Sequence, residues 1–440
     1  MRIPTTLLAT CLIAAPTMAQ QRDIVAAVDA DYAAHLETLF LDFHKNPELS
    51  FLETRTAAVM AKELRAIGGI DVTEKVGGTG VVGVMRNGDG PVLLMRADMD
   101  GLPLKEDSDL PYAATTTQVD RDGVVKPVMH ACGHDVHITA LLGAARQLVR
   151  RKDQWKGTIV FVAQPAEERI AGARAMLADG LYTRFPKPDY AIGFHVTTAY
   201  PAGKIGLDPG VALSSANSVD ITIPGVGAHG ASPHLGKDPI VMGAEIVMAL
   251  QTLVSRTISP LKPGVVTVGS FQAGNKHNII PDNAVLQLSL RADEEDTRQK
   301  LLDGIRRIAV NVGRMNGMPE DRLPQVTIGP ESTPVTYNDP DLTERVRGAL
   351  AAALGKDVLM YQPRDWMGSE DFAYFIQQDL KVPGAFFWVG GTPHSEFEAA
   401  KNGGPPVRPH HSPLFRVDAK ASVTRGTQAM AVAALDLLKK

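Results

Sequence analysis

The amino-acid sequence predicts an α/β protein, with helices on both faces of a mixed sheet and a smaller α+β unit inserted into it. Continuous apolar stretches such as GTIVFVAQP (157–165) and DYAIGFHV (189–196) are typical of strands buried on both faces. Amphipathic segments with helical spacing alternate with these strands, which favours a layered α/β arrangement. Between about 216 and 330 the strands alternate apolar and polar residues instead, which is typical of a half-exposed sheet.

Within the main unit, residues 32–43 and 55–67 have helical periodicity. The segment GVVGVMRNGDGPVLLMRADMD (80–100) predicts two strands joined by a turn at 87–90. From Val136 to Val149 apolar residues recur at helical spacing, which predicts a helix directly after a loop that contains Cys132 and His134.

The inserted unit is predicted from four segments. SVDITIPG (218–225) and NAVLQLSLRA (283–292) alternate like strands, and residues 238–254 and 294–315 are amphipathic. We therefore divide the chain into an export signal (1–19), a first catalytic part (20–215), an inserted unit (216–330) and a second catalytic part (331–440).

Bulk composition narrows the class of partner. A chain of 440 residues exceeds what one hydrophobic core usually supports. Lys and Arg total 45 and Asp and Glu total 49, so the net charge is only −4. Nucleic acids and anionic membranes call for basic patches, so we expect neither, and a small molecule is the favoured partner.

The N-terminal segment MRIPTTLLATCLIAAPTMAQQ (1–21) is typical of an export signal that is cut after Ala19. Its apolar run is too short to span a bilayer comfortably, so we expect an exported, periplasmic or secreted protein with no membrane contact after cleavage. A lipoprotein signal at Cys11 is the weaker alternative. If the signal is cut after Ala19, Cys11 is removed with it and Cys132 is the one remaining cysteine, and a lone thiol in an oxidising compartment favours a functional role.

Polar residues gather where three predicted strands end and at one junction between a loop and a predicted helix. Ligands of open α/β sheets bind beyond the carboxyl ends of the strands, so these side chains are expected on a common rim. Thiolate, imidazole and carboxylate together suit divalent ions such as Zn²⁺, Mn²⁺, Co²⁺ or Ni²⁺. The residues concerned are Asp98, Asp100, Cys132, His134, Glu167, Glu168 and His195.

Two other interpretations stay open at this point. Cys132 is a nucleophile with a histidine base in one of them, which explains the thiol but leaves the acids without a role. In the other, the protein binds amino-acid conjugates without turning them over. The presence of Glu167 beside the predicted ligands favours an enzyme over a binding protein.

Eight motifs together resemble a known family. In this order, they are similar to those of the hippurate hydrolase and indoleacetyl-amino-acid hydrolase group of metal-dependent amidohydrolases, which is related to aminoacylase and the glutamate carboxypeptidases. The likeness covers almost the whole chain after the signal. The motifs are ADMDGLP (97–103), MHACGHDVH (129–137), QPAEE (164–168), GFH (193–195), GAHGASPH (227–234), NIIPD (278–282), GSEDFAYF (368–375) and HHSPLF (410–415).

The resemblance implies hydrolysis of the amide bond of N-acyl amino acids or small peptides by two divalent ions (Zn, Mn, Co or Ni). Glu167 would be the general base, and Asp100 would orient a ligand imidazole. Where the carboxypeptidase relatives have a histidine ligand, this chain has Asp98, so the second metal site is expected to differ. The implied metal ligands are Cys132, which would bridge the ions, and His134, Glu168, His195 and His411.

The resemblance also implies the architecture: a phosphorylase/hydrolase-like catalytic domain with a ferredoxin-like insert that acts as lid and mediates a homodimer or higher oligomer. On the insert, His229 would stabilise the oxyanion or hold the substrate. Asn278, Arg291 and Glu370 are candidates for gripping the substrate's carboxylate or amide.

Overall fold

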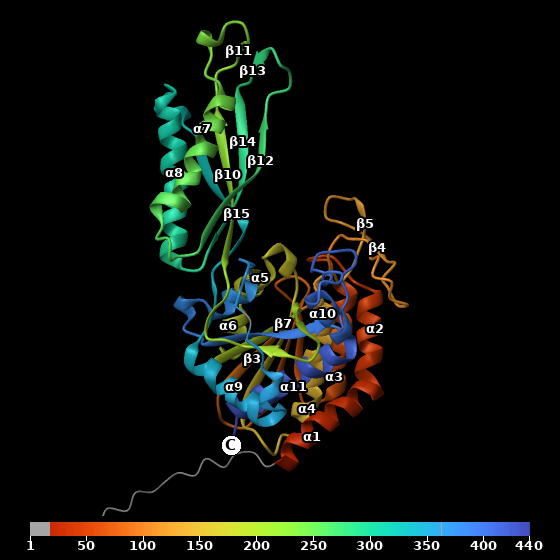
Figure 1. Cartoon of the computed structure of the whole chain (residues 1–440). Helices are drawn as coiled ribbons and strands as arrows, with labels where there is room; N and C mark the ends of the chain where they lie inside the picture. Colours follow the sequence, from red (N-terminus) through yellow and green to blue (C-terminus); the bar gives the residue numbers. More distant parts are fainter. Residues whose placement is uncertain (1–17, 362) are drawn as a thin grey trace, which may run out of the picture.

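The computed structural model describes residues 18–361 and 363–440. The expected export signal lies outside these residues except for its last two positions, and Cys11 lies outside them too. Two units make up the described chain: a layered body and a long projection built on a separate sheet (Figure 1). The predicted fold class, α/β with an inserted α+β unit, is thereby confirmed.

A seven-stranded mixed sheet forms the centre of the body, in the order β1-β2-β6-β3-β7-β17-β8. Strands β6, β3, β7 and β17 are parallel to one another, and the pairs at either edge are antiparallel. The strands are β1 (Asp71–Val76), β2 (Gly80–Asn87), β3 (Val92–Asp98), β6 (Gly157–Gln164), β7 (Tyr190–Pro201), β8 (Ile205–Gly206) and β17 (Gly384–Thr392).

Strands β2 and β3 are consecutive in the chain but are not neighbours in the sheet. Strand β6 lies between them, antiparallel to β2 and parallel to β3. The predicted strands and turn at 80–100 are therefore present, but they do not form a hairpin. All side chains of β6 except Thr158 are buried, because the strand is central and covered on both faces.

Alternate residues of the central strands supply two separate cores. On β6, Ile159 and Phe161 pack with the helices of one face, and Val160 and Val162 pack on the other. The first face is covered by α1 (Met18–Asp31), α2 (Glu37–Lys45), α3 (Thr54–Ile67), α4 (His134–Val149), α9 (Pro340–Leu354) and α11 (Ala419–Leu437).

The second face is covered mainly by α5 (Gly172–Ala178), α6 (Leu181–Arg184) and a 3₁₀ segment, Asp371–Ile376. Smaller elements complete the body: α10 (His394–Lys401), the hairpin β4 (Thr117–Val119) and β5 (Val125–Pro127), and the pair β9 (Gly210–Leu213) and β16 (Thr336–Asn338).

The projecting unit is a four-stranded antiparallel sheet in the order β12-β14-β10-β15, with two helices on one face (Figure 1). Its β-α-β-β-α-β succession is that of the ferredoxin-like fold. The elements are β10 (Ser215–Pro224), α7 (Pro239–Thr252), β12 (Gly264–Ala273), β14 (Asn283–Ala292), α8 (Glu295–Met315) and β15 (Gln325–Thr333), with the short pair β11 (Ala228–His229) and β13 (Ile279–Ile280) at its far end.

Helix α7 and the turn after it, Pro239–Thr257, are long and apolar enough by composition to cross a membrane. One side of this segment packs on the four-stranded sheet through Met242, Ile246 and Leu250. Only 28% of the most apolar 18-residue stretch of this segment is buried inside the protein. Its other side is therefore an open hydrophobic surface, on which Met248 is 71% exposed.

Candidate metal centre

The carboxyl ends of β3 and β6, the middle of β7 and the start of α4 meet at one place, where the proposed metal ligands lie together. His195 is expected from the sequence to close its strand, but β7 continues beyond it to Pro201. The ligands line or adjoin a cavity of about 650 Å³, the metal-site cavity, into which Cys132, Glu167, Glu168, His195 and His411 face. His411 comes from the loop before α11, far along the chain, and its backbone N–H donates to the Ala131 carbonyl at 2.9 Å.

Cys132 lies at the middle of the group. Its Sγ is 3.4 Å from Nε2 of His195 and 3.3 Å from Nε2 of His411. Gly133 directly after it has a φ of 81°, and a Cβ there would lie 2.3 Å from the Val196 side chain. Glycine is therefore required for the turn that places the thiol and the start of α4 against β7.

His134 is buried with neither ring nitrogen hydrogen-bonded. Its Nδ1 lies 3.4 Å from Asp100, and its Nε2 lies 3.8 Å from Glu167 and 3.9 Å from Glu168. Oε1 of Glu168 is also buried without a partner. Buried polar atoms without partners are rare, and a divalent cation requires several electron-pair donors close together, as the ligand atoms of His134, Glu167 and Glu168 are, all within 4.8 Å of one another. The donor set therefore fits a metal ion.

His195 and His411 each turn Nε2 toward the Cys132 thiol. Nδ1 of His195 donates to the Val196 carbonyl at 2.6 Å, which leaves Nε2 as the acceptor beside the thiol. Nε2 of His411 lies 3.4 Å from Glu168. The backbone of His411 has a φ of 59°, an uncommon conformation for a residue with a side chain.

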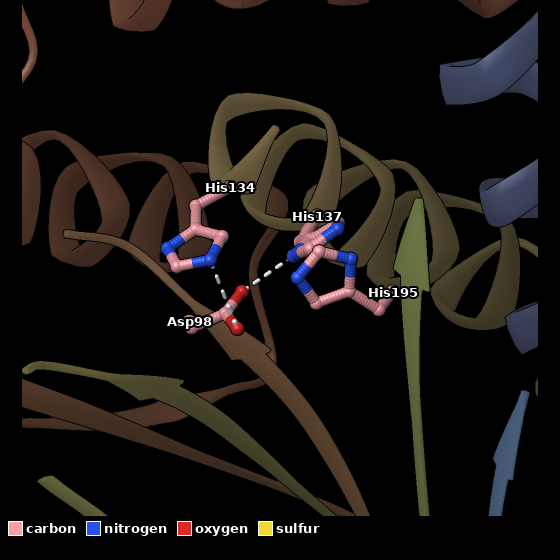
Figure 2. Close-up of side chains that lie close together, drawn as sticks. All are labelled: Asp98, His134, His137 and His195. Atoms are coloured by element: carbon pink, nitrogen blue, oxygen red, sulfur yellow. Dashed lines mark hydrogen bonds and ion pairs between the residues drawn. The ribbon is translucent and has the colours of Figure 1, made fainter. Parts of the chain in front are cut away.

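Asp98 belongs to a hydrogen-bond network at the base of the group (Figure 2). It accepts from Nδ1 of His137 at 2.5 Å and from Arg96 at 2.8 Å, and it lies 3.6 Å from Nε2 of His134. Nε2 of His137 accepts from the Val196 backbone N–H at 2.8 Å, so both of its nitrogens are used. Asp98 therefore lies next to the proposed ligand His134, and the hydrogen bond from His137 fixes the position of its carboxylate.

Glu370 is only 2% exposed and forms part of the cavity wall. Its Oε1 accepts from Arg96 at 2.7 Å and from the Phe372 backbone N–H at 3.0 Å. The fully buried guanidinium of Arg96 thus joins Glu370, Asp98 and Asp371 into one network. This arrangement commits the Glu370 carboxylate to the protein and not to the cavity.

Two carboxylates hold the turn that carries Glu167 and Glu168. Asp100 accepts from both of their backbone N–H groups at 3.1 Å, and it also accepts from Ser50. Glu53 accepts from the N–H of Ala166, whose φ is 50°. Glu53 is not among the predicted site residues, because in the sequence an acid directly before a helix looks like an ordinary cap.

The surroundings of the acids and the thiol raise their pKa values and so favour their protonated, neutral forms. Burial raises the pKa of Glu167 well above its ordinary value, and the charges of Glu370 and Glu168 raise it further. Burial raises the pKa of Glu168 to about 8, although the charge of His134 opposes the shift. Burial, and then the charge of Glu168, raises the pKa of Cys132 well above its usual range. A bound divalent ion would favour the charged forms of all three.

Of the proposed residues on the inserted unit, Arg291 reaches the site. It lines the metal-site cavity and donates to Ser369 at 2.7 Å, and burial lowers its pKa. Among the described residues no carboxylate forms an ion pair with it. His229 and Asn278 lie instead at the far end of the projection, on and beside β11 and β13, away from the metal ligands (Figure 1).

Comparison with known proteins agrees with this geometry. Residues 94–402 match the model of peptidase family M20/M25/M40. The hippurate hydrolase of Campylobacter jejuni is 36% identical over 79% of this chain and 86% of its own length, and thermostable carboxypeptidase 2 of Saccharolobus solfataricus is 36% identical over 85% and 88%. A solved dinuclear metal-binding peptidase of the M20 family from Bacillus subtilis superposes with a TM-score of 0.74, at 29% identity over 93% of this chain and 99% of that one.

The cluster of side chains that could hold a metal ion and the match over most of the chain lead to one conclusion. The chain belongs to peptidase family M20/M25/M40 and is a metal-dependent amidohydrolase that cleaves amide bonds.

Proposed function

We propose that this enzyme hydrolyses N-acyl amino acids or small peptides at the amide bond next to a free carboxylate, using two divalent ions. The observation that carries the proposal is the set of buried, unpartnered nitrogen and oxygen atoms of His134 and Glu168 beside the Cys132 thiol. The hippurate hydrolase and carboxypeptidase relatives support this substrate class, and the dinuclear relative supports two ions.

Cys132, at the centre of the group, is the residue best placed to be shared between two ions. His134, Glu168, His195 and His411 would complete the ligand set. Thiolate, imidazole and carboxylate together suit Zn, Mn, Co or Ni. Bound ions of this kind would supply Lewis-acid chemistry for amide hydrolysis.

Glu167 acts as the general base and then as the general acid. It takes a proton from the attacking water and returns it to the leaving amine. Burial, with the charges of Glu370 and Glu168, raises its pKa above that of an ordinary carboxyl, so the group holds a proton more readily than an exposed glutamate does. Asp100 positions this base by holding its backbone N–H, and it also faces the Nδ1 of His134.

Arg291 holds the carboxylate of the substrate. Its guanidinium faces the metal-site cavity without an ion-pair partner among the described residues, so a substrate carboxylate would complete its hydrogen bonding. Placed there, the carboxylate would set the adjacent amide over the metal ligands.

A panel of N-acyl amino acids and dipeptides, assayed by amine release, tests the proposal. Chelator should abolish activity and add-back of a divalent metal should restore it. Cys132→Ser should lower metal content and rate together. A rate loss with full metal retained, or activity that survives chelation but not iodoacetamide, would favour the cysteine-nucleophile alternative. Ligand binding without turnover of any substrate would favour a binding protein.

We also propose a homodimer formed through the inserted unit. The open side of α7 carries exposed Val241 and Met248, and β12 is an edge strand with free hydrogen-bonding groups. Pairing of two such surfaces would bury both. Sedimentation should give a dimer for the native protein and a monomer for Met248→Asp, while Lys440→Asp, at the exposed end of the body, should leave the dimer intact.

Export is the last part of the proposal. The segment 1–19 has the composition of a signal peptide with cleavage after Ala19. N-terminal sequencing of the protein recovered from the periplasm or medium should begin at Gln20. An intact Met1 on protein that stays inside the cell would overturn this part alone.

A further inference from the structure

A second cavity, of about 230 Å³, adjoins the metal-site cavity, and we name it the aromatic cavity. Four residues line both spaces: Thr197, Ala199, Trp366 and Trp388. The two indoles are therefore the shared wall between the reacting centre and the space beyond it.

The aromatic cavity gathers exposed aromatic side chains. Tyr361 is 68% exposed and Trp366 is 58% exposed, the two highest values for a large aromatic side chain in the described part of the chain, and both line this cavity. Below them lie Trp388 and the buried Phe386. Apolar surface left open and gathered at one hollow is typical of a ligand site.

The polar groups of the cavity are mostly committed to the protein. The Asn338 amide donates to two backbone carbonyls and accepts from the Phe386 backbone N–H. Arg364 donates to Ser214 and pairs with Asp293. Asp365 is exposed to solvent and would repel a second carboxylate. The cavity therefore offers ring faces and few free hydrogen-bonding groups.

The two indoles are fixed in place relative to the metal ligands. The Trp388 ring centre lies 5.8 Å from that of His195 and 6.0 Å from that of Phe386. The Trp366 ring lies over Gly368, where an added Cβ would come within 2.0 Å of it. A side chain at position 368 would displace the indole, so this position of the ring depends on the glycine.

We propose that the aromatic cavity binds a flat aromatic group of the substrate, with Trp366 as the stacking surface. The inference rests on the proposed amidohydrolase function and deepens it. The aromatic group has two sources, the acyl part of the substrate or the side chain of its amino acid. Stacked rings contribute beyond the area that they bury, so the preference should be measurable.

The test compares N-benzoylglycine, N-acetylphenylalanine and N-acetylglycine on the native enzyme, Trp366→Ala and Tyr337→Ala. Tyr337 is 52% exposed and lines neither cavity, so it is the matched control. For the aromatic substrate that places its ring in the cavity, the ratio of its kcat/KM to that of N-acetylglycine should be about tenfold lower in Trp366→Ala than in the native enzyme. The change should come from a higher KM. The control should keep the native ratios.

Unchanged ratios for both aromatic substrates in a folded Trp366→Ala protein would overturn the inference and leave the proposed function standing. Hydrolysis of none of the three substrates would count against the proposed function. In that case calorimetric binding of N-benzoylglycine and N-acetylphenylalanine to native and Trp366→Ala protein decides the inference: equal affinities refute it, and about tenfold weaker binding of either one supports it.

Discussion

The carboxylate of Glu53 accepts a hydrogen bond at 2.8 Å from the backbone N–H of Ala166, the residue directly before the proposed general base. Glu53 lies just ahead of α3, and it also accepts from the N–H of Phe51 and the hydroxyl of Thr79. Burial and the charge of Asp100 raise its pKa to about 8. A residue distant in sequence therefore holds the backbone on which the base is mounted.

Replacing Glu53 by alanine should disturb this backbone. The donors of Ala166, Phe51 and Thr79 lose their acceptor, and the buried N–H of Ala166, left unsatisfied, costs about 1–3 kcal/mol. We expect kcat to fall by about 10- to 100-fold, since small displacements of a base are costly, with KM little changed. Glu53→Gln retains one acceptor oxygen and should restore part of kcat. Equal kcat for the alanine variant and the native enzyme would remove Glu53 from this role.

Replacing Glu167 by glutamine should abolish proton transfer while leaving the metal ligands in place. We expect kcat to fall by about 10²–10⁴. Metal content measured by plasma mass spectrometry should stay at the native level. Glu37→Gln, on the exposed side of α2, is the control and should match the native enzyme in both measurements.

Replacing Arg291 by alanine should weaken recognition of the substrate carboxylate. Hydrogen bonds to charged groups contribute about 1.5–3 kcal/mol, so KM should rise roughly 10- to 100-fold with a smaller change in kcat. The KM of Arg291→Lys should lie between those of the native enzyme and Arg291→Ala. For the same substrate with its carboxylate converted to a carboxamide, the KM values of the native enzyme and Arg291→Ala should be similar. A large difference in KM for the carboxamide would argue against carboxylate recognition by Arg291.

His44 should make stability fall as pH rises above neutrality. Burial opposes its charge, but hydrogen bonds with Asp135 at 2.6 Å and Glu106 at 3.2 Å outweigh burial and raise its pKa to about 9 from 6.5, with the Tyr112 ring packed beside it. Below pH 6.5 both folded and unfolded chains hold the proton, so the stabilisation is complete. Between 6.5 and 9 only the folded chain keeps it, so the free energy of unfolding should fall by about 1.4 kcal/mol per pH unit.

Urea unfolding at several pH values between 6.5 and 9.5 checks this slope. The His44→Gln protein should lack the His44 part of the decline. His35→Gln, at a more exposed histidine paired with Glu63, is the matched control and should decline like the native protein. Identical slopes for all three proteins would exclude His44 as the source.

Local patterns in the sequence predict much of this fold, because they report burial. The apolar run of β6 and the alternation in β14 follow from how many faces of each strand are covered. The insertion of β6 between β2 and β3 is different, since it depends on pairing between distant segments. No pattern within residues 80–100 distinguishes it from a hairpin.

The same division holds for the site. Glu167 and Glu168 can be predicted because strand ends in such sheets gather at one rim. Cys132 and His134 can be predicted because they lie where a loop leads into a helix beside that rim. The supporting role of Asp98 depends on Arg96 and His137 approaching it from either side. The distance of His229 from the metal ligands depends on the direction of the whole projection, which local residue patterns do not encode.

The two points at which the chain enters and leaves the projection lie side by side, since Ala216 on β10 faces Thr333 on β15. Directly opposed residues of antiparallel strands are about 5 Å apart at their Cα atoms, a gap that a two-residue turn bridges. Excising the projection and closing the gap would therefore give a shorter protein that keeps every proposed metal ligand but loses Arg291. Such a truncated protein should still bind the metal ions but bind the substrate carboxylate more weakly.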